Sequence, residues 1–398
     1  MDSVKKESSL SDHGHILQKL LLSNHKLALD IYKQLLIHDG PERSGNLIFS
    51  PISLQIALLM LLSGANGKTA EELKTGLNLR TEEKDELLLG TKLLLESLQN
   101  SCLKVASKMF VANKFPVKKS YEQLVKNYFE PIYRNVKFAK FPTETADFIN
   151  SWVSEKTNNL ITDVISPRDL DEYTVMILLN AVYFKAEWSR KFGSMLTENE
   201  SFHVSPDKCI DIAMMTNPYE YLGYSKQKSF GILEIPYKDG KDLRFFVFLP
   251  DEINGLAQVE NTLFETEFQE MLREVKRTLV SLKLPKMKIE ESVNVKRILG
   301  KLGMKVMFNP YCADFFDMFS REEVEDVLYV DDLFHKAVLK VNEDGTEAAG
   351  LTYGQLRGGA DCAPTDMVDF HVNRPFIFMI LQKDSILFMG RVINPQKY

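Results

Sequence analysis

The sequence predicts an α+β protein folded as one large domain, and three observations support this fold class. Helical patterns dominate the first third of the chain, strand patterns follow, and no Pro-, Gly- or Ser-rich linker separates them. The 398 residues are enough to bury a large core. A content of 44% hydrophobic and 26% charged residues is ordinary for a soluble globular protein.

Four helices are expected in the first third of the chain. Apolar residues within 28–35 recur at the spacing of one buried helical face. A helix over 51–62 has Ser50 at its N-cap position and a proline at its first helical position. The segment 69–72, Thr-Ala-Glu-Glu, has the spacing of a capping box and should open another helix. The Leu-rich segment 87–98 is the fourth.

Strand patterns then take over. The segment 105–111 partly alternates, whereas 175–184, with the sequence VMILLNAVYF, is almost continuously apolar, as in a central strand buried on both faces. Two strands separated by Gln-Lys-Asp-Ser should form a hairpin near the end of the chain. The later strand candidates, in chain order and ending with this hairpin, are 243–250, 281–289, 336–341, 376–381 and 386–392.

Composition and charge argue against several classes of protein. A net charge of −6 leaves no excess of Lys and Arg for phosphates, so no nucleic-acid partner is expected. The longest apolar run, 56–62, is too short to cross a bilayer, so no membrane partner is expected. The first residues lack a hydrophobic signal region, so we expect a cytoplasmic protein, or an extracellular one if this is a mature form. The four widely spaced cysteines are interpreted as free thiols.

The motifs of the common catalytic and cofactor sites are missing from the sequence. The run GANGKT at 64–69 superficially resembles a phosphate-binding loop, but that loop needs a glycine where Leu62 stands and a strand before it. No nucleophile elbow, zinc-binding helix or dinucleotide fingerprint occurs, and the seven histidines are scattered. The sequence therefore predicts no catalytic residue, no metal site and no cofactor, and a protein that is not an enzyme.

The chain carries six long motifs in a fixed order, at 46–73, 148–165, 178–192, 233–250, 335–350 and 388–395. Together they resemble those of serpins, and the resemblance extends from about Asn24 to the end of the chain. It implies a serpin fold with about nine helices, three β-sheets and an exposed reactive-centre loop at about 344–371. It also implies an N-terminal tail over 1–23 and a single domain over 24–398.

The resemblance implies a monomeric suicide inhibitor of serine or cysteine proteases. In such inhibitors the protease cleaves the loop and becomes acylated, and the upstream part of the loop inserts into the central sheet as a new strand. Fold alone does not decide function, because some serpins are chaperones, hormone carriers or storage proteins. The alternative is therefore a non-inhibitory serpin that acts as a binding or carrier protein.

The run VNEDGTEAAGLTYGQLRGG at 341–359 favours the inhibitory alternative. An inserted strand buries every second side chain. If Thr346 faces inward, Ala348, Gly350 and Thr352 do so as well, and none of the four is charged or a proline. An ordinary Gly/Ala-rich surface loop is the competing interpretation. The hinge residues implied by the resemblance are Glu343, Gly345, Thr346, Glu347, Ala348, Ala349 and Gly350.

Other positions match family sites that support insertion. Ser50, Ser53, Asn180 and His335 match the shutter, a buried polar cluster under the sheet, and they are also what satisfied core polar groups would be. Trp188 matches the breach, where the loop first enters the sheet, and is equally suited to be a core aromatic residue. Glu343 and Lys283 resemble the family's charge pair at the top of the sheet.

The bond that the protease cleaves is left open between neighbouring positions. The family's usual spacing from Glu343 places it at Gly359–Ala360, although glycine suits neither trypsin-like nor chymotrypsin-like pockets. The Leu-Arg pair ending at Arg357 suits a papain-like cysteine protease or a trypsin-like serine protease. The run LRGG also resembles the tail cut by ubiquitin-directed cysteine proteases. The predicted reactive-bond region is therefore Arg357, Gly358, Gly359 and Ala360.

Overall fold

The computed structural model describes residues 2–38, 45–98, 103–129, 133–138, 140–238, 242–319, 327–346 and 367–395. The chain divides into two compact units. Unit 1 comprises Met1–Pro41, Ser50–Tyr183 and Ser292–Ala337, and unit 2 comprises Glu42–Phe49, Phe184–Glu291 and Val338–Tyr398. Helices and strands both contribute, so the predicted α+β class is confirmed. Within the described residues, no helix is long and apolar enough to cross a membrane.

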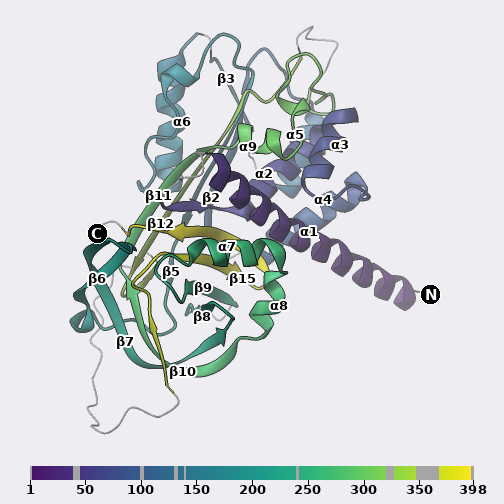
Figure 1. The fold of residues 1–398 in the computed structure, drawn as a ribbon. Helices are drawn as coiled ribbons and strands as arrows, with labels where there is room; N and C mark the ends of the chain where they lie inside the picture. Colours follow the sequence, from purple (N-terminus) through teal and green to yellow (C-terminus); the bar gives the residue numbers. More distant parts are fainter. Residues whose placement is uncertain are drawn as a thin grey trace. The chain divides into compact units, whose positions relative to one another are not determined.

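Unit 1 combines helices with the larger part of one sheet. Its strands pair in the order β3-β2-β4-β12, with β2 and β3 parallel. In Figure 1 the helices α1 to α5 of this unit lie together, and α6 lies apart from them. Its helices are α1 Asp2–His38, α2 Pro51–Gly64, α3 Gly67–Gly76, α4 Lys84–Leu98, α5 Lys119–Tyr128, α6 Pro142–Lys156 and α9 Lys296–Lys301. Its strands are β2 Leu103–Ala112, β3 Tyr133–Val136, β4 Met176–Phe184 and the first part of β12 Asp332–Asn342.

The α2 helix confirms the expectation for its start. The Ser50 side chain caps the helix by accepting a hydrogen bond from the Ser53 amide, and Pro51 occupies the first turn. All of its residues are buried, as expected for a helix that is apolar all round. Its first turn is therefore held firmly in the core of unit 1.

The capping box expected at 69–72 is wrong. The α3 helix begins earlier, at Gly67, and Asn66 is its N-cap residue. The Thr69 hydroxyl accepts a hydrogen bond from the Asp314 amide instead, at 2.9 Å. The Glu72 carboxylate accepts from the amides of residues 305 and 306. The side chains of Thr69 and Glu72 thus accept hydrogen bonds from a distant segment of unit 1 and do not cap their own helix.

The first helix extends well into the segment that the sequence assigned to an N-terminal tail over 1–23. The α1 helix is continuous over Asp2–His38, and Ile16 and Leu20 on it are buried. Gly90 on α4 permits this contact, because a Cβ atom added there would lie 2.8 Å from the Ile16 side chain. Burial of this apolar stripe makes the last part of the expected tail a packed helix.

Unit 2 is built on a sheet with the strand order β1-β16-β15-β9-β8-β7-β10-β14, to which β6 adds by pairing with β7. The hairpin expected near the end of the chain is confirmed as β15 and β16, whose residues are all buried. The strands are β1 Leu47–Phe49, β6 Glu198–Ser205, β7 Lys208–Lys226, β8 Phe230–Pro236, β9 Leu243–Pro250, β10 Lys276–Pro285, β14 Val368–His371, β15 Phe376–Gln382 and β16 Ser385–Val392. The helices are α7 Leu256–Glu265 and α8 Phe268–Arg273.

The described strands form two hydrogen-bonded sheets, whereas three were expected. The reason is the length of β7. Residues 208–214 of β7 pair with β6, residues 214–224 pair with β10, and residues 223–226 pair with β8. The single strand β7 therefore joins β6 and β10 to β8 and its neighbours in one sheet. The strand expected over 281–289 is two strands, because β10 ends at Pro285 and β11, Met287–Asn294, begins after Lys286 and pairs with β12.

Candidate functional site

The predicted hinge, which starts at Glu343, contains a very short strand, β13, formed by Gly345–Thr346. This strand pairs antiparallel with the end of β12 on one side and with β5, Ala186–Glu187, on the other. Gly345 and Thr346 therefore already occupy strand positions between two neighbours in unit 2. The sequence predicted this location only for the inserted loop.

Thr346 is the residue that defines the inward direction of the hinge. Its side chain is fully buried, and its hydroxyl oxygen lies 2.7 Å from the hydroxyl oxygen of Tyr237. A buried hydroxyl needs such a partner, because an unpaired one would cost about 1–3 kcal/mol. The structure thus places Thr346 in the inward orientation that the alternation argument assumed.

Gly345 is required where β13 meets β5. Its φ of +154° lies in a region that side chains other than glycine rarely adopt. A Cβ atom added there would lie 2.6 Å from the Glu187 Cα atom. Just before Gly345, the Asn342 side-chain oxygen accepts hydrogen bonds from the amides of Asp344 and Gly345, both at 3.1 Å. This local turn reverses the chain from β12 into β13.

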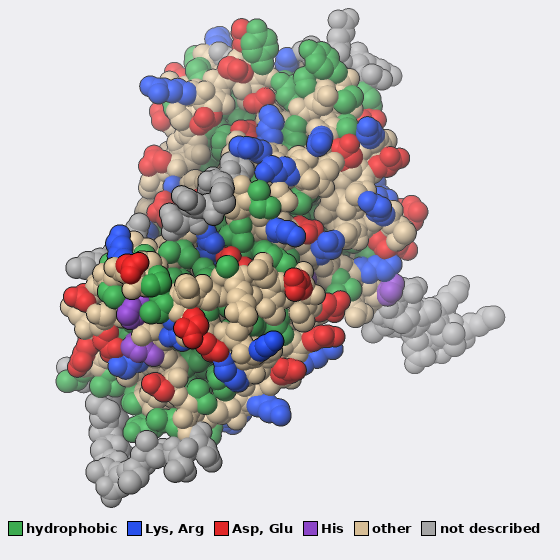
Figure 2. Space-filling model, in the orientation of Figure 1, with side chains coloured by type: hydrophobic (Ala, Val, Ile, Leu, Met, Phe, Trp, Pro, Cys, Tyr) green, Lys and Arg blue, Asp and Glu red, His purple; other side chains and the backbone are tan. Residues whose placement is uncertain are grey.

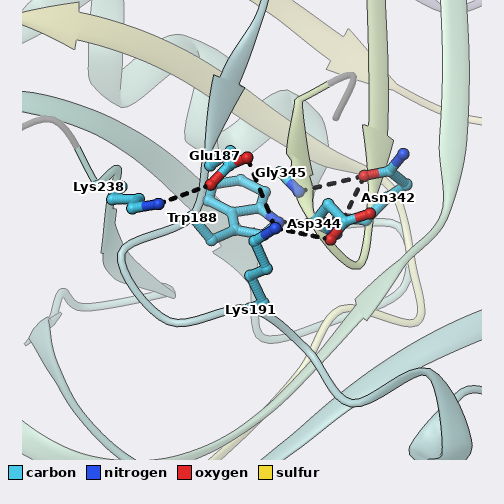
Figure 3. Close-up of polar contacts among 7 residues, drawn as sticks. All are labelled: Glu187, Trp188, Lys191, Lys238, Asn342, Asp344 and Gly345. Carbon is cyan, nitrogen blue, oxygen red and sulfur yellow. Dashed lines mark hydrogen bonds and ion pairs between the residues drawn. The ribbon is translucent and has the colours of Figure 1, made fainter. Parts of the chain in front are cut away.

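Trp188, the predicted breach residue, donates two hydrogen bonds to this turn. It is fully buried, and its indole Nε1 donates to the Asn342 carbonyl at 2.9 Å. Its backbone amide donates to the Asp344 carbonyl at 3.0 Å. Its ring stacks on Tyr237 with centroids 4.6 Å apart. Trp188 is therefore both a core aromatic and a hydrogen-bond donor to the hinge (Figure 3).

A chain of alternating charges surrounds the turn, as Figure 3 shows. Lys191 Nζ lies 2.9 Å from an Asp344 carboxylate oxygen and 3.6 Å from one of Glu187, and Lys238 lies 3.1 Å from Glu187. The hydrogen bond to Asp344 raises the pKa of Lys191. The hydrogen bond from Lys238 lowers the pKa of Glu187. The charges thus link Asp344, at the start of the hinge, to the end of β5.

The ion pair expected between Glu343 and Lys283 is wrong in its lysine. Glu343 pairs with Lys286 at 2.9 Å and accepts a hydrogen bond from the Thr197 hydroxyl at 3.0 Å. Lys283 pairs with Glu200 of β6, at 2.7 Å. The cause is the break after Pro285, which leaves Lys286 between β10 and β11, while Lys283 lies within β10.

The four predicted shutter residues form one hydrogen-bonded cluster in unit 1, and all four are buried. Asn180 on β4 is its centre. Its side-chain oxygen lies 2.7 Å from both the Ser53 hydroxyl and His335 Nδ1, and its amide donates to the Ser107 hydroxyl at 2.6 Å. The Ser50 amide donates to His335 Nε2 at 3.0 Å. The bond from Asn180 to His335 directly joins β4 to β12, which are neighbouring strands.

These contacts determine the protonation state of His335. Because Nε2 accepts from the Ser50 amide, the ring proton sits on Nδ1 and is donated to Asn180. Burial lowers the pKa of His335 to about 3. The ring is therefore neutral near pH 7, and an added proton on Nε2 would face the Ser50 N–H group.

Some predicted site residues lie outside the described part of the chain, and others emerge only from the structure. Sequence reasoning missed Ser107, Tyr237, Asn342 and Lys286, which contact the two clusters. Polar and aromatic residues of these types carry no spacing signal that marks them. The predicted residues outside the described ranges are Glu347, Ala348, Ala349, Gly350, Arg357, Gly358, Gly359 and Ala360.

The comparisons with known proteins agree with this geometry. The family model described as Serpin (serine protease inhibitor) matches residues 22–395. Serpin B3 of Homo sapiens is 32% identical over 94% of this chain and 98% of its own length. The leukocyte elastase inhibitor of Bos taurus is 31% identical over 95% of this chain and 100% of its own. The solved structure of Serpin48 from the insect Tenebrio molitor matches with a TM-score of 0.83 and 28% identity, covering 95% and 99% of the two chains. The chain belongs to the serpin family.

The buried histidine predicts a loss of stability in mild acid. Unfolded histidine binds a proton near pH 6.5, whereas folded His335 resists protonation until about pH 3. Its contribution to stability is therefore present above pH 6.5 and is lost as the pH falls below that value. The expected slope is about 1.4 kcal/mol per pH unit below pH 6.

Urea unfolding at pH 7, 6 and 5 measures this slope. His335→Gln should be less stable than wild type at pH 7, and the difference should narrow by pH 5. His203→Gln is the control, because its ring belongs to an exposed contact with Cys209 in unit 2. If the unfolding free energies of wild type and His335→Gln change equally between pH 7 and pH 5, the interpretation of His335 as a neutral imidazole is wrong.

The strand position of Gly345 leads to a second prediction. Gly345→Ala should displace β13 from β5 and destabilise the protein by about 1–3 kcal/mol, because the added Cβ meets the Glu187 backbone. Hydrogen exchange of the peptide 338–346 should become faster. Gly193→Ala is the matched control, since its added Cβ would have no neighbour nearer than 3.6 Å. Unchanged exchange in Gly345→Ala would contradict the pairing of β13 with β5.

Proposed function

We propose that this protein inhibits a protease by trapping it covalently, through completion of the strand insertion that β13 begins. The observation that carries the proposal is Thr346, already buried between β12 and β5. Protease inhibition is also the function named for the leukocyte elastase inhibitor, which matches nearly the whole chain. The proposed partner is a papain-like cysteine or trypsin-like serine protease.

The chemistry of trapping follows from partial proteolysis. The protease nucleophile attacks the carbonyl carbon of the bait bond, the C–N bond breaks, and the new amine takes the proton. The upstream part of the loop stays attached to the enzyme as an ester or thioester. Insertion of that part then moves the acylated enzyme away before water can release it.

Alternation along the strand explains why this loop can continue to insert. With Thr346 inward, the next inward positions are Ala348, Gly350 and Thr352. Small, uncharged side chains fit a sheet interior without leaving a buried charge. The larger Leu351 and Tyr353 fall on the other face.

The shutter cluster has to open when a new strand separates its neighbours. The bond from His335 to Asn180 joins β12 to β4, so it must break as the strands part. A typical buried hydrogen bond contributes about 0.5–1.5 kcal/mol. The proposal requires that the free energy gained from a complete new strand exceeds this cost.

Thr346→Arg tests the proposed trapping. Thr346 is already buried in β13, and an arginine cannot be buried there without a large desolvation cost. The variant should therefore fail to form β13, so that insertion slows and the protease escapes by hydrolysis. The number of inhibitor molecules consumed per protease should rise roughly tenfold, which corresponds to about 1.4 kcal/mol between trapping and release. Denaturing gels show the adduct, and circular dichroism shows that the fold remains.

Ala349→Arg is the matched control, because the sequence alternation predicts an outward side chain at position 349, so trapping should persist. Wild-type stoichiometry in Thr346→Arg would contradict the hinge assignment. Cleavage by every protease of a serine and cysteine panel, with no adduct, would favour the binding or carrier function instead. The mass of the released C-terminal peptide distinguishes cleavage after Arg357 from cleavage after Gly359.

A further inference from the structure

An exposed pair of tyrosines on β7 has no role in the hinge or in the shutter. Tyr219 is 53% exposed and Tyr221 is 60% exposed, although both lie in a regular strand. The side chain of the next residue, Leu222, points to the opposite face of the sheet and is buried. The two rings thus stand on the solvent side of the sheet. Figure 2 shows hydrophobic and charged side chains interspersed over the region of β7 and β10.

Neighbouring strands hold these rings in position. Tyr221 pairs across the sheet with Leu279 of β10, and the Arg277 guanidinium lies 5.5 Å from the centre of the Tyr221 ring. Arg190 donates to the Tyr219 carbonyl at 2.7 Å. We call Tyr219, Tyr221, Arg277 and Leu279 the tyrosine face. Rigid aromatic rings beside an arginine are the side chains most often responsible for affinity in protein interfaces.

One of the two tyrosines, Tyr219, lies in a strand irregularity. The register between β7 and β10 shifts where Val280 faces Glu220 and Leu282 faces Asn217, so β7 contains one additional residue at this point. The Asn217 side chain bonds to Glu220 across the irregularity, at 2.5 Å. Such bulges reorient a side chain at the edge of a functional region.

The tyrosine face lies beside the strand that follows the reactive loop. The β14 strand pairs in parallel with β10, with Val368 opposite Val280 and Asp369 opposite Ser281. Leu279 of the tyrosine face immediately precedes Val280. Only β10 separates β7 from β14, and paired strands are about 4.8 Å apart, so Tyr221 lies roughly 10 Å from the line of β14.

A protease bound to the loop must cover surface near β14. The fully extended chain reaches at most about 29 Å from Ala360 to Val368, or about 36 Å from Gly358 if cleavage follows Arg357. A protease of about 230 residues is roughly 45 Å across. The diameter of the enzyme is therefore larger than the length of chain between the cleaved bond and β14. The enzyme surface beside the active site thus comes within reach of the tyrosine face.

Charge indicates the kind of surface that fits. Arg190, Lys276 and Arg277 are exposed around the two rings. Glu220 on the same strand is half-buried, and Asp369 lies farther away, on β14. Glu234 is half-buried beside Gly223, and the exposed Glu274 accepts a hydrogen bond from Gln227. Arg277, over the Tyr221 ring, is therefore the exposed charge nearest the rings, and it suits a carboxylate on a partner.

We propose that the tyrosine face is a second contact surface for the target protease, which binds an acidic patch beside the protease active site. The inference rests on the proposed inhibitory function for the identity of this partner. In this arrangement the loop sequence selects the cleaved bond, while Tyr221 and Arg277 select the body of the enzyme and speed its encounter.

The experiment measures binding without the trapping chemistry. The probes are a trypsin-like serine protease and a papain-like cysteine protease, each with its nucleophile replaced by alanine. Tyr221→Ser and Arg277→Gln should each raise the dissociation constant for the bound protease at least about fivefold, as expected for interface residues worth about 1 kcal/mol or more. The Arg277→Gln variant should also bind with a weaker dependence on salt.

Tyr311→Ser is the matched control, because Tyr311 is 90% exposed and belongs to the other unit. Affinities for Tyr221→Ser and Arg277→Gln equal to that of the control would overturn the proposal, as would no binding to either probe. A wild-type dimer that Tyr221→Ser dissociates would assign the face to a second copy and would also overturn it.

The active enzymes give an independent readout of trapping. If adducts form but the variants bind the inactive probes like the control, the tyrosine face is wrong and the inhibitory function stands. If no adduct forms but the variants weaken binding, the inhibitory function is wrong and the contact surface stands.

Discussion

The burial of Thr346 between two strands is the constraint on which the rest of the site depends. A side chain can be buried there only if the chain turns sharply after β12, which requires the Asn342 turn and a glycine at position 345. The hydroxyl then needs a partner in the core, and Tyr237 supplies it. Trp188 stacks on that tyrosine and bonds to the same turn, so hinge and core are one hydrogen-bonded structure.

The two polar clusters perform different physical tasks. At the hinge, exposed and half-buried charges on Lys191, Asp344 and Glu187 set the position of the turn, and solvent weakens each pair. At the shutter, neutral groups bond in the core, where every unmade hydrogen bond is costly. Both the side-chain oxygen and the side-chain amide of Asn180 form hydrogen bonds there, so this side chain is fully hydrogen-bonded in the closed sheet. A latch made of neutral hydrogen bonds can open without moving a buried charge.

The recognition and the trapping that we propose use different parts of the molecule. In the proposed mechanism the buried Thr346 and the buried shutter cluster take part in trapping. The tyrosine face is exposed, lies on β7 and β10, and shares no residue with either cluster. Substitutions on this face can therefore alter the choice of protease without altering the strand insertion that we propose.

The sequence by itself determined the elements whose residues agree with one another over many positions. Continuous apolar runs identified α2, β4 and the terminal hairpin. The alternation of small residues assumed that Thr346 faces inward, and this residue is buried. The Ser, Asn and His residues of the shutter were recognised only through family motifs, because isolated polar residues have no periodicity.

Only the tertiary structure decided which distant groups meet. It assigned Lys286 and not Lys283 to Glu343, gave the capping-box side chains of α3 to another segment, and merged two expected sheets through β7. It also showed that Arg277 lies over Tyr221. The physical reason is that side-chain periodicity reports only whether a position is buried, whereas a hydrogen bond or ion pair depends on strand register and on breaks such as the one at Pro285.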